Sequence, residues 1–315
     1  MSKNGGSANS ESLRDMARAA ESWATQGKST ELEHWLDREV DGEGVPIRLT
    51  IPEWSECLKA LVEARAQRPD WPEKLEERTR CLLRSVLRFS RTDGTPTTRF
   101  NGEVAPEARE NLRALANAFP RTGEARVLGW WLSLSRIAHV PPPLPAWSCQ
   151  RQPLAVLRAS WQKEEDMVVV DHRERGSVTR LEVIGSGQSW LEPEWTSSLS
   201  AGPITAPKPR QWVSNSVADL AEWSHRASGA SITRTALMLR GRQIAILADE
   251  VAGKTPLSEP LESRLALPPG VTAVPLPDCR GMLLRQAGQR AGALALPLAL
   301  PCLPYETERG EFRTG

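Results

Sequence analysis

The sequence is poor in the residues that build metal sites and disulfide frameworks. Its five cysteines lie far apart without a Cys-x-x-Cys pair, and its four histidines never occur in pairs at metal-ligand spacing. This argues against a zinc ribbon, a disulfide scaffold and a histidine-rich metal centre, so we expect no metal and no cofactor. Cysteines that remain reduced favour a cytoplasmic location.

Long apolar runs and an excess of one charge are also missing. No run of about eighteen apolar residues occurs, so no transmembrane helix and no membrane partner are predicted. Basic and acidic side chains are nearly balanced in each half and the net charge is +1, which disfavours a nucleic-acid partner. Residues 1–11 are small and polar and lack the apolar centre of a signal peptide, so we expect a disordered tail.

Familiar catalytic motifs are absent as well. There is no Gly-x-Ser-x-Gly nucleophile elbow, and no cysteine stands in an activating context. The run Gly-Ser-Gly at 185–187 is followed by Trp190 and Pro193 instead of a helix start, which indicates a hairpin turn rather than a phosphate-binding loop. The chain has twelve tryptophans against one tyrosine, and tryptophan suits both sugar binding and ordinary packing.

What is present is a change of hydrophobic period along the chain. At 315 residues, two domains are expected. Residues 12–140 carry apolar side chains at three- and four-residue spacing, beginning with Leu13 and Met16, which predicts six helices. Pro52, Pro72 and Pro106 open the third, fourth and fifth helices, because the N–H that proline lacks is unpaired in a first turn anyway.

A β-rich domain is predicted after a proline-rich linker at 141–150. From 151 to 315 the period changes to two or to continuous apolar runs. We expect strands at 153–161, 167–170, 178–184, 232–239, 243–248, 282–285 and 294–300, with a long loop at 199–210. Short strands without crossover helices favour antiparallel pairing. The predicted fold class is therefore α+β: an N-terminal helical domain of α/α type, then an antiparallel β-sandwich-like domain.

The β-rich domain looks incomplete at its C-terminal end. Residues 306–315 resemble the opening of a hairpin that has no closing strand. An open sheet exposes an edge that another element should cover. Either the form is truncated, or a partner supplies the missing strands.

Two clusters of charged residues are candidate sites. Asp171, His172 and Arg173 follow an apolar strand. They either point into a ligand cleft or form a hairpin rim in which the carboxylate pairs with the guanidinium, and the rim is the favoured interpretation. His225 lies in a second cluster with Asp219, where alternate residues of an extended segment point to opposite faces. This histidine could exchange a proton near neutral pH.

A longer motif lies at 231–249, which reads Ser-Ile-Thr-Arg-Thr-Ala-Leu-Met-Leu-Arg-Gly-Arg-Gln-Ile-Ala-Ile-Leu-Ala-Asp. A strand bearing Thr233 and Arg234 leads through a turn to a hydrophobic strand that ends in Asp249. This pattern resembles a segment of heparinase II/III-like polysaccharide lyases, and the closing residues 294–315 are also similar to that family. The resemblance implies an α/α toroid followed by a β-sandwich.

The sequence departs from that family in the groups that such lyases use to abstract a proton. The single tyrosine, Tyr305, lies near the C-terminus, and Ile232 stands where the family often carries histidine. The helical part is also too short for a full toroid. The resemblance therefore implies a fold that is retained with incomplete lyase machinery.

Three functions are considered. The leading hypothesis is a heparinase II/III-like protein that binds an acidic polysaccharide in a cleft between the two domains, through arginines that meet its anionic groups and tryptophans that stack on its sugar rings. These ligand residues would be Arg173, Arg234, Arg240, Arg242, Trp190, Trp195, Trp212 and Trp223. The second hypothesis is an active lyase with His172 or His225 as base. The third is a structural subunit that pairs with a protein partner, or with itself, through an open sheet edge.

Overall fold

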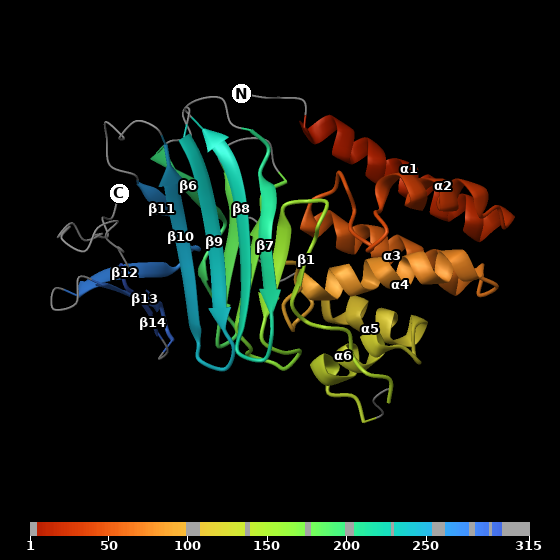
Figure 1. Ribbon diagram of the computed structural model, residues 1–315. Helices are drawn as coiled ribbons and strands as arrows, with labels where there is room; N and C mark the ends of the chain where they lie inside the picture. The colour runs from red at the N-terminus through yellow and green to blue at the C-terminus, as the bar shows by residue number, and fades with distance from the viewer. Residues whose placement is uncertain are drawn as a thin grey trace.

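The computed structural model describes residues 5–98, 108–135, 139–173, 178–198, 205–227, 230–253, 262–276, 281–289 and 292–297. Within these residues, helices come first and strands follow, which confirms the α+β class. Figure 1 shows the helices on one side of the molecule, two stacked sheets in the middle, and a small sheet on the far side. No helix in the described part of the chain is long and apolar enough to cross a membrane.

Six helices occur where the apolar spacing predicts them. They are α1 (Gly5–Gln26), α2 (Thr30–Glu39), α3 (Ile51–Gln67), α4 (Glu73–Arg88), α5 (Ala108–Ala118) and α6 (Gly123–Leu132). Pro52 lies in the first turn of α3, where the Glu53 side chain also accepts the backbone N–H of Thr50 at 2.7 Å. The first helix begins at Gly5, within the segment 1–11 that the sequence analysis assigned to a tail. Extending a formed helix costs little compared with starting one.

The strands form three antiparallel sheets. They are β1 (Trp147–Ser148), β2 (Leu154–Arg158), β3 (Met167–Asp171), β4 (Thr179–Gly185), β5 (Gln188–Leu191), β6 (Glu194–Ser197), β7 (Lys208–Ser214), β8 (Ala218–Ala227), β9 (Ala230–Leu239), β10 (Ile244–Ala252), β11 (Ser263–Leu265), β12 (Val271–Leu276), β13 (Gly281–Gln286) and β14 (Gly292–Ala295). The first sheet has the order β1-β2-β3-β4-β6-β11, with β5 paired to β4. The second has the order β10-β9-β8-β7, and the third β12-β13-β14.

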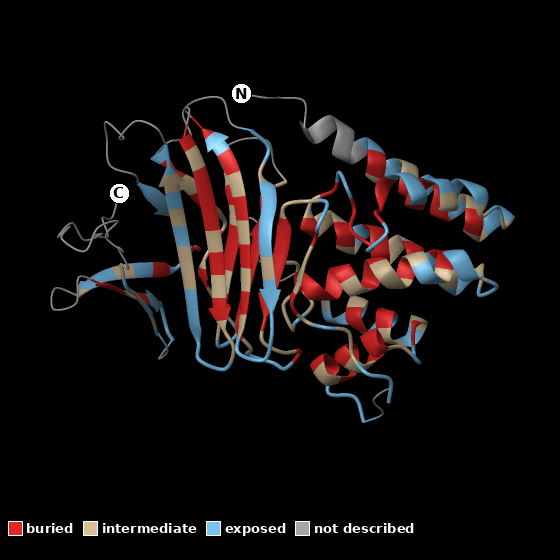
Figure 2. Ribbon diagram, viewed as in Figure 1, coloured by how far each residue is buried: buried red, intermediate tan, exposed pale blue. Residues whose placement is uncertain are grey.

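Some strands lie where the sequence predicted none or a loop. Residues 208–210, the end of the expected loop, belong to β7, whose residues are mostly exposed (Figure 2). This strand lies at the edge of its sheet, where Pro209 is tolerated because an outward-facing donor is not needed. The strand expected at 294–300 is seen only as part of β14, and the expected hairpin at 306–315 lies outside the described residues.

The central strands of the first sheet are buried on both faces. Every residue of β2 and β3 is buried (Figure 2). Leu154 and Val156 belong to the core shared with the helices, whereas Ala155 and Leu157 belong to the core shared with the second sheet. The sequence therefore shows continuous apolar runs here instead of alternation. One sheet serves two cores, so the helical and sandwich layers are joined through it.

The linker at 141–150 lies against both parts of the chain. The indole N–H of Trp161 donates to the carbonyl of Pro143 at 2.6 Å, and Arg88 donates to that of Leu144 at 3.2 Å. The linker then enters β1, which pairs with β2. These bonds hold the proline-rich segment in place between the layers.

The loops that follow α2 and α4 share the same backbone hydrogen bond and a glycine at the same place. In the loop after α2, the N–H of Asp41 bonds to the carbonyl of Val45 at 2.9 Å. In the loop after α4, the N–H of Arg91 bonds to the carbonyl of Thr95 at 2.8 Å. Gly44 and Gly94 have φ of 89° and 91°, a backbone conformation that glycine adopts without strain. The helical layer is therefore built from repeated helix–loop–helix units.

A buried arginine from the first sheet joins these layers. Arg158 lies at the end of β2 and donates through Nη1 to the carbonyls of Leu87 at 3.2 Å and Ser90 at 2.9 Å, at the C-terminal end of α4. Its guanidinium stacks over Trp131 and Trp161, at 5.1 and 4.8 Å from the ring centroids. A cation is favourable at a helix C-terminus because the unpaired carbonyls carry partial negative charge. Burial lowers the pKa of Arg158 to about 9.

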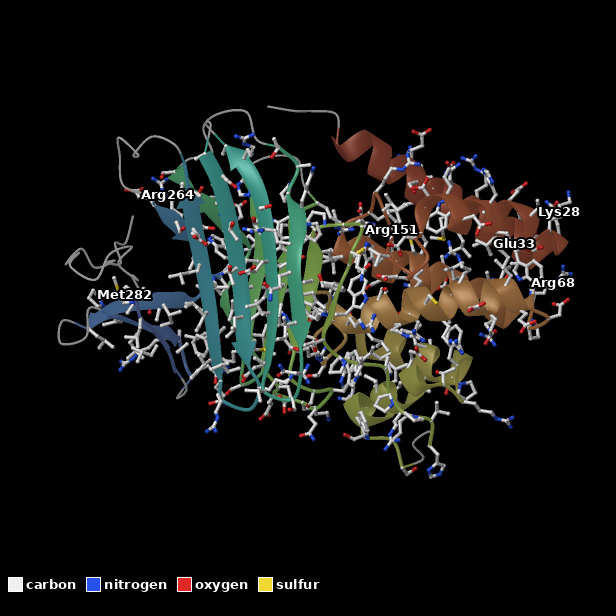
Figure 3. The ribbon with its side chains drawn as sticks, in the orientation of Figure 1. Lys28, Glu33, Arg68, Arg151, Arg264 and Met282 are labelled. Atoms are coloured by element: carbon white, nitrogen blue, oxygen red, sulfur yellow. The ribbon has the colours of Figure 1, made fainter. Side chains whose placement is uncertain are left out.

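We predict that Arg158→Met lowers the free energy of unfolding by roughly 3 kcal/mol, since several buried carbonyls lose their donor at about 1 kcal/mol each. Arg264→Met is the control, because that side chain is 75% exposed and lies on the side of the sheets away from the helices (Figure 3). It should change the free energy by less than about 0.5 kcal/mol. Chemical denaturation measures both, and equal losses would contradict the structural role of Arg158.

Candidate functional site

The predicted arginine Arg234 lies inside the sandwich. It belongs to β9, is 1% exposed, and forms two hydrogen bonds with Asp249 of β10, Nε–Oδ1 at 2.8 Å and Nη2–Oδ2 at 3.1 Å. Its Nη1 donates to the hydroxyl of Thr179 and, at 3.0 Å, to the carbonyl of Trp195. The guanidinium also stacks over the Trp195 ring at 4.3 Å. Arg234 of the second sheet is therefore bonded both to Asp249 of its own sheet and to Thr179 and Trp195 of the first sheet, and it links the two sheets.

Both candidate histidines belong to the same buried cluster. His172 is 3% exposed and its Nδ1 lies 2.7 Å from the Thr179 hydroxyl. That hydroxyl also accepts from Nη1 of Arg234, so Thr179 bridges the histidine and the arginine. Burial, Arg234 and His225 lower the pKa of His172 well below its usual value, and burial and Arg234 lower that of His225. Both rings are therefore neutral near pH 7.

Three other predicted arginines have distinct environments. Arg173 pairs with Asp171 at 2.7 Å and donates to the carbonyl of Pro46 at 3.0 Å, which is the rim arrangement favoured from the sequence. Arg240 pairs with Asp219 at 2.6 Å. Arg242 is exposed in the turn between β9 and β10.

The four predicted tryptophans do not form a binding surface. Trp195 and Trp223 are each 1% exposed in the sandwich core, and Trp212 packs against that core. Trp190 is 6% exposed and belongs to the core beneath the third sheet. Binding of a sugar by Trp195 or Trp223 would require the sandwich to open.

A large concavity among the described residues lies elsewhere. It is a cleft of about 620 Å³ where the loop after α4 meets the first and third sheets. Its lining residues are mostly polar and are Arg91, Thr92, Asp93, Arg158, Lys163, Glu164, Glu165, Met167, Ile184, Ser186, Gly187, Gln188, Ser189, Glu192, Pro268, Pro269, Gln286 and Gln289. None of the residues that the sequence analysis proposed for ligand binding or catalysis lines it.

Arg91, which lines the cleft, bonds to two acidic groups: Glu192, which also lines it, and Glu182, which is fully buried behind it. Arg91 donates to Glu182 through Nε at 2.9 Å and to Glu192 through Nη2 at 3.3 Å. Burial, followed by the neighbouring Glu182 carboxylate, raises the pKa of Glu192 to about 7. These three residues come from separate segments, so no residue spacing in the sequence could predict that they contact one another.

No model of a known protein family matches the chain, and no curated protein matches it. Among solved structures, the chain is similar to heparinase III, the BT4657 gene product, with a TM-score of 0.64 and 14% sequence identity over 90% of this chain. A second structure of that product, with methylated lysines, matches with a TM-score of 0.59 and 13% identity. The chain has the fold of heparinase III.

The likeness to heparinase III confirms, for the fold, the resemblance found in the sequence. The chain spans about half the length of the heparinase III structure, because the match covers 50% of that chain. At this level of identity the comparison establishes the fold alone. Within the described residues, no group of three His, Cys, Asp or Glu side chains is placed to hold a metal ion.

We predict that Arg234→Met lowers the free energy of unfolding by about 3–5 kcal/mol, because it leaves the buried Asp249 carboxylate unpaired. Arg242→Ala, in the exposed turn of the same hairpin, should change it by less than about 0.5 kcal/mol. Urea unfolding measures both. A fully stable Arg234→Met protein with reduced polysaccharide binding would instead favour the ligand role first predicted for this residue.

A second prediction concerns pH. The pKa of Glu192 is raised in the folded protein, so its proton stabilises the fold at acidic pH and that contribution is lost as pH rises through about 7. The melting temperature of Glu192→Gln should therefore rise relative to the unmutated protein between pH 5 and pH 8. Scanning calorimetry across this range measures the difference, and a constant difference would contradict the raised pKa.

Proposed function

We propose that the chain binds an acidic polysaccharide in the cleft between the helical layer and the sheets, without complete lyase machinery. The observation that carries the proposal is the buried guanidinium of Arg158, which lines the cleft and, among the described residues, is hydrogen-bonded only to carbonyl groups. A buried cation without a carboxylate partner attracts an anion strongly, because the surrounding dielectric is low.

The rest of the lining supports a sugar polymer over a simple anion. Lys163 adds a second cation, while Gln188, Gln286 and Gln289 offer amide donors and acceptors. The acidic residues Glu164 and Glu165 can accept hydrogen bonds from sugar hydroxyls. A volume of about 620 Å³ lies in the range of ligand clefts. The fold shared with heparinase III, a protein named for its action on heparin-like polysaccharide, agrees with this class of ligand.

The lyase and subunit alternatives have weaker support. His172 and His225, the candidate bases, lie inside the sandwich and do not line the cleft. Self-association through a sheet edge stays a prediction. One edge of the second sheet is β7, where Lys208, Pro209 and a bulge between Pro209 and Gln211 oppose pairing with another strand.

The proposal predicts that an acidic polysaccharide stabilises the protein and that a charge reversal in the cleft removes the effect. Heparan sulfate, hyaluronan and alginate, with dextran as the neutral polymer, should be tested by melting temperature and by ultraviolet absorbance. Lys163→Glu should weaken binding of the stabilising polymer by roughly tenfold, about 1.4 kcal/mol. Lys163 is exposed and, within the described part of the chain, bonds only to Ser133, at 2.9 Å, so the substitution leaves the core intact.

Lys208→Glu is the matched control, because Lys208 is equally exposed but lies on β7, outside the cleft. It should leave the melting shift unchanged. Equal losses in both variants, or no shift with any acidic polymer, would refute the proposal. Growth of an absorbance from unsaturated uronate would establish the lyase alternative.

A further inference from the structure

Glu182 and Glu192 both accept hydrogen bonds from the guanidinium of Arg91, but the bonds that Glu182 receives are shorter and more numerous. Glu182 accepts from Arg91 through both Nε, at 2.9 Å, and Nη2, at 2.5 Å, and from the backbone N–H of Thr98 at 2.7 Å. Glu192 receives only longer bonds at Oε2, 3.3 Å from Arg91 and 3.3 Å from the hydroxyl of Ser189. Glu182 is thus the carboxylate that Arg91 neutralises.

The second oxygen of Glu192 has no hydrogen-bond partner among the described residues. This atom, Oε1, is buried, and the residue as a whole is 5% exposed and lines the cleft. A buried charged oxygen without a partner costs free energy, and protonation or a ligand removes that cost. Glu192 can therefore take a further polar partner that the described residues do not supply.

The charges around Glu192 decide what that group can be. Arg91, from the loop after α4, and Glu182, from β4, face it directly. The other charged residues of the cleft are Asp93, Arg158, Lys163, Glu164 and Glu165. Glu182 already takes most of the Arg91 charge, so an ionised Glu192 would repel a carboxylate or sulfate that is drawn in by Arg158 and Lys163.

We infer that Glu192 determines ligand specificity in the cleft: it takes up one proton from solvent when an anionic sugar binds, and releases it when the sugar leaves. The protonated carboxyl can donate an O–H to a ligand oxygen, which an ionised one cannot do. The inference rests on the proposed function, since it requires a ligand in this cleft. It adds that binding of an acidic polysaccharide is coupled to the protonation of this one side chain.

The coupling has a defined sign. A nearby anion stabilises the protonated form of Glu192, and by linkage the protonated form binds the anion more tightly. In the free protein the pKa of Glu192 is about 7, so the proton is already present at pH 5.5 and must be taken up at pH 8. Affinity should therefore fall as pH rises above neutrality.

Isothermal titration calorimetry with heparan sulfate tests this, at pH 5.5 and pH 8 in pairs of buffers that differ in ionisation enthalpy. We expect uptake of nearly one proton per bound site at pH 8 and almost none at pH 5.5, with affinity about tenfold weaker at pH 8. Glu192→Gln should bind at both pH values with less than about twofold difference and no proton uptake, because its amide is neutral and donates.

Glu250→Gln is the control, since it removes an exposed carboxylate on β10 that lies outside the cleft. It should keep both the proton uptake and the pH dependence. Heparan sulfate binding with no proton uptake, or with equal uptake in Glu192→Gln, would overturn the role of Glu192 while leaving the proposed function standing. Absence of binding at both pH values would overturn both.

Discussion

The contact between Arg158 and the end of α4 is the constraint on which the rest of the structure depends. The central strands of the first sheet are covered on both faces, so any polar side chain on them must find a partner inside the protein. Arg158 finds the carbonyls at the C-terminus of a helix. This one guanidinium fixes the distance between the helical layer and the sheet, and it also forms part of the cleft wall.

The two faces of the first sheet use polar residues in different ways. On the sandwich side, Thr179 joins the buried cluster of Arg234 and Asp249, where nearly every bond is internal and the result is a rigid joint. On the helical side, Glu182 contacts Arg91, next to a carboxyl group, Glu192, that keeps an unpaired oxygen at the wall of the cleft. A buried polar cluster in which every group has a hydrogen-bond partner stabilises the fold. A group that lacks a partner, such as Glu192, can instead bond to a ligand.

The likeness to heparinase III shows how little sequence identity this architecture needs. At 14% identity the two structures match over 90% of this chain with a TM-score of 0.64. What must be preserved is the pattern of apolar residues, because packing requires hydrophobic side chains of suitable size on the right face more than particular residues. A site, in contrast, depends on individual groups, so the fold alone does not carry the function over.

The sequence by itself determined the α+β class, the order of domains, the six helices and the central strands, because hydrophobic period is a local property that survives in a single chain. It also indicated the pairing of Asp171 with Arg173, two residues apart. Only the tertiary structure decided which charged residues meet. Arg234 looked like a ligand residue and His225 like a catalytic base, but the facing sheet buries them. The cleft joins Arg91, Arg158 and Glu192 from three distant segments, and no local pattern records such a meeting.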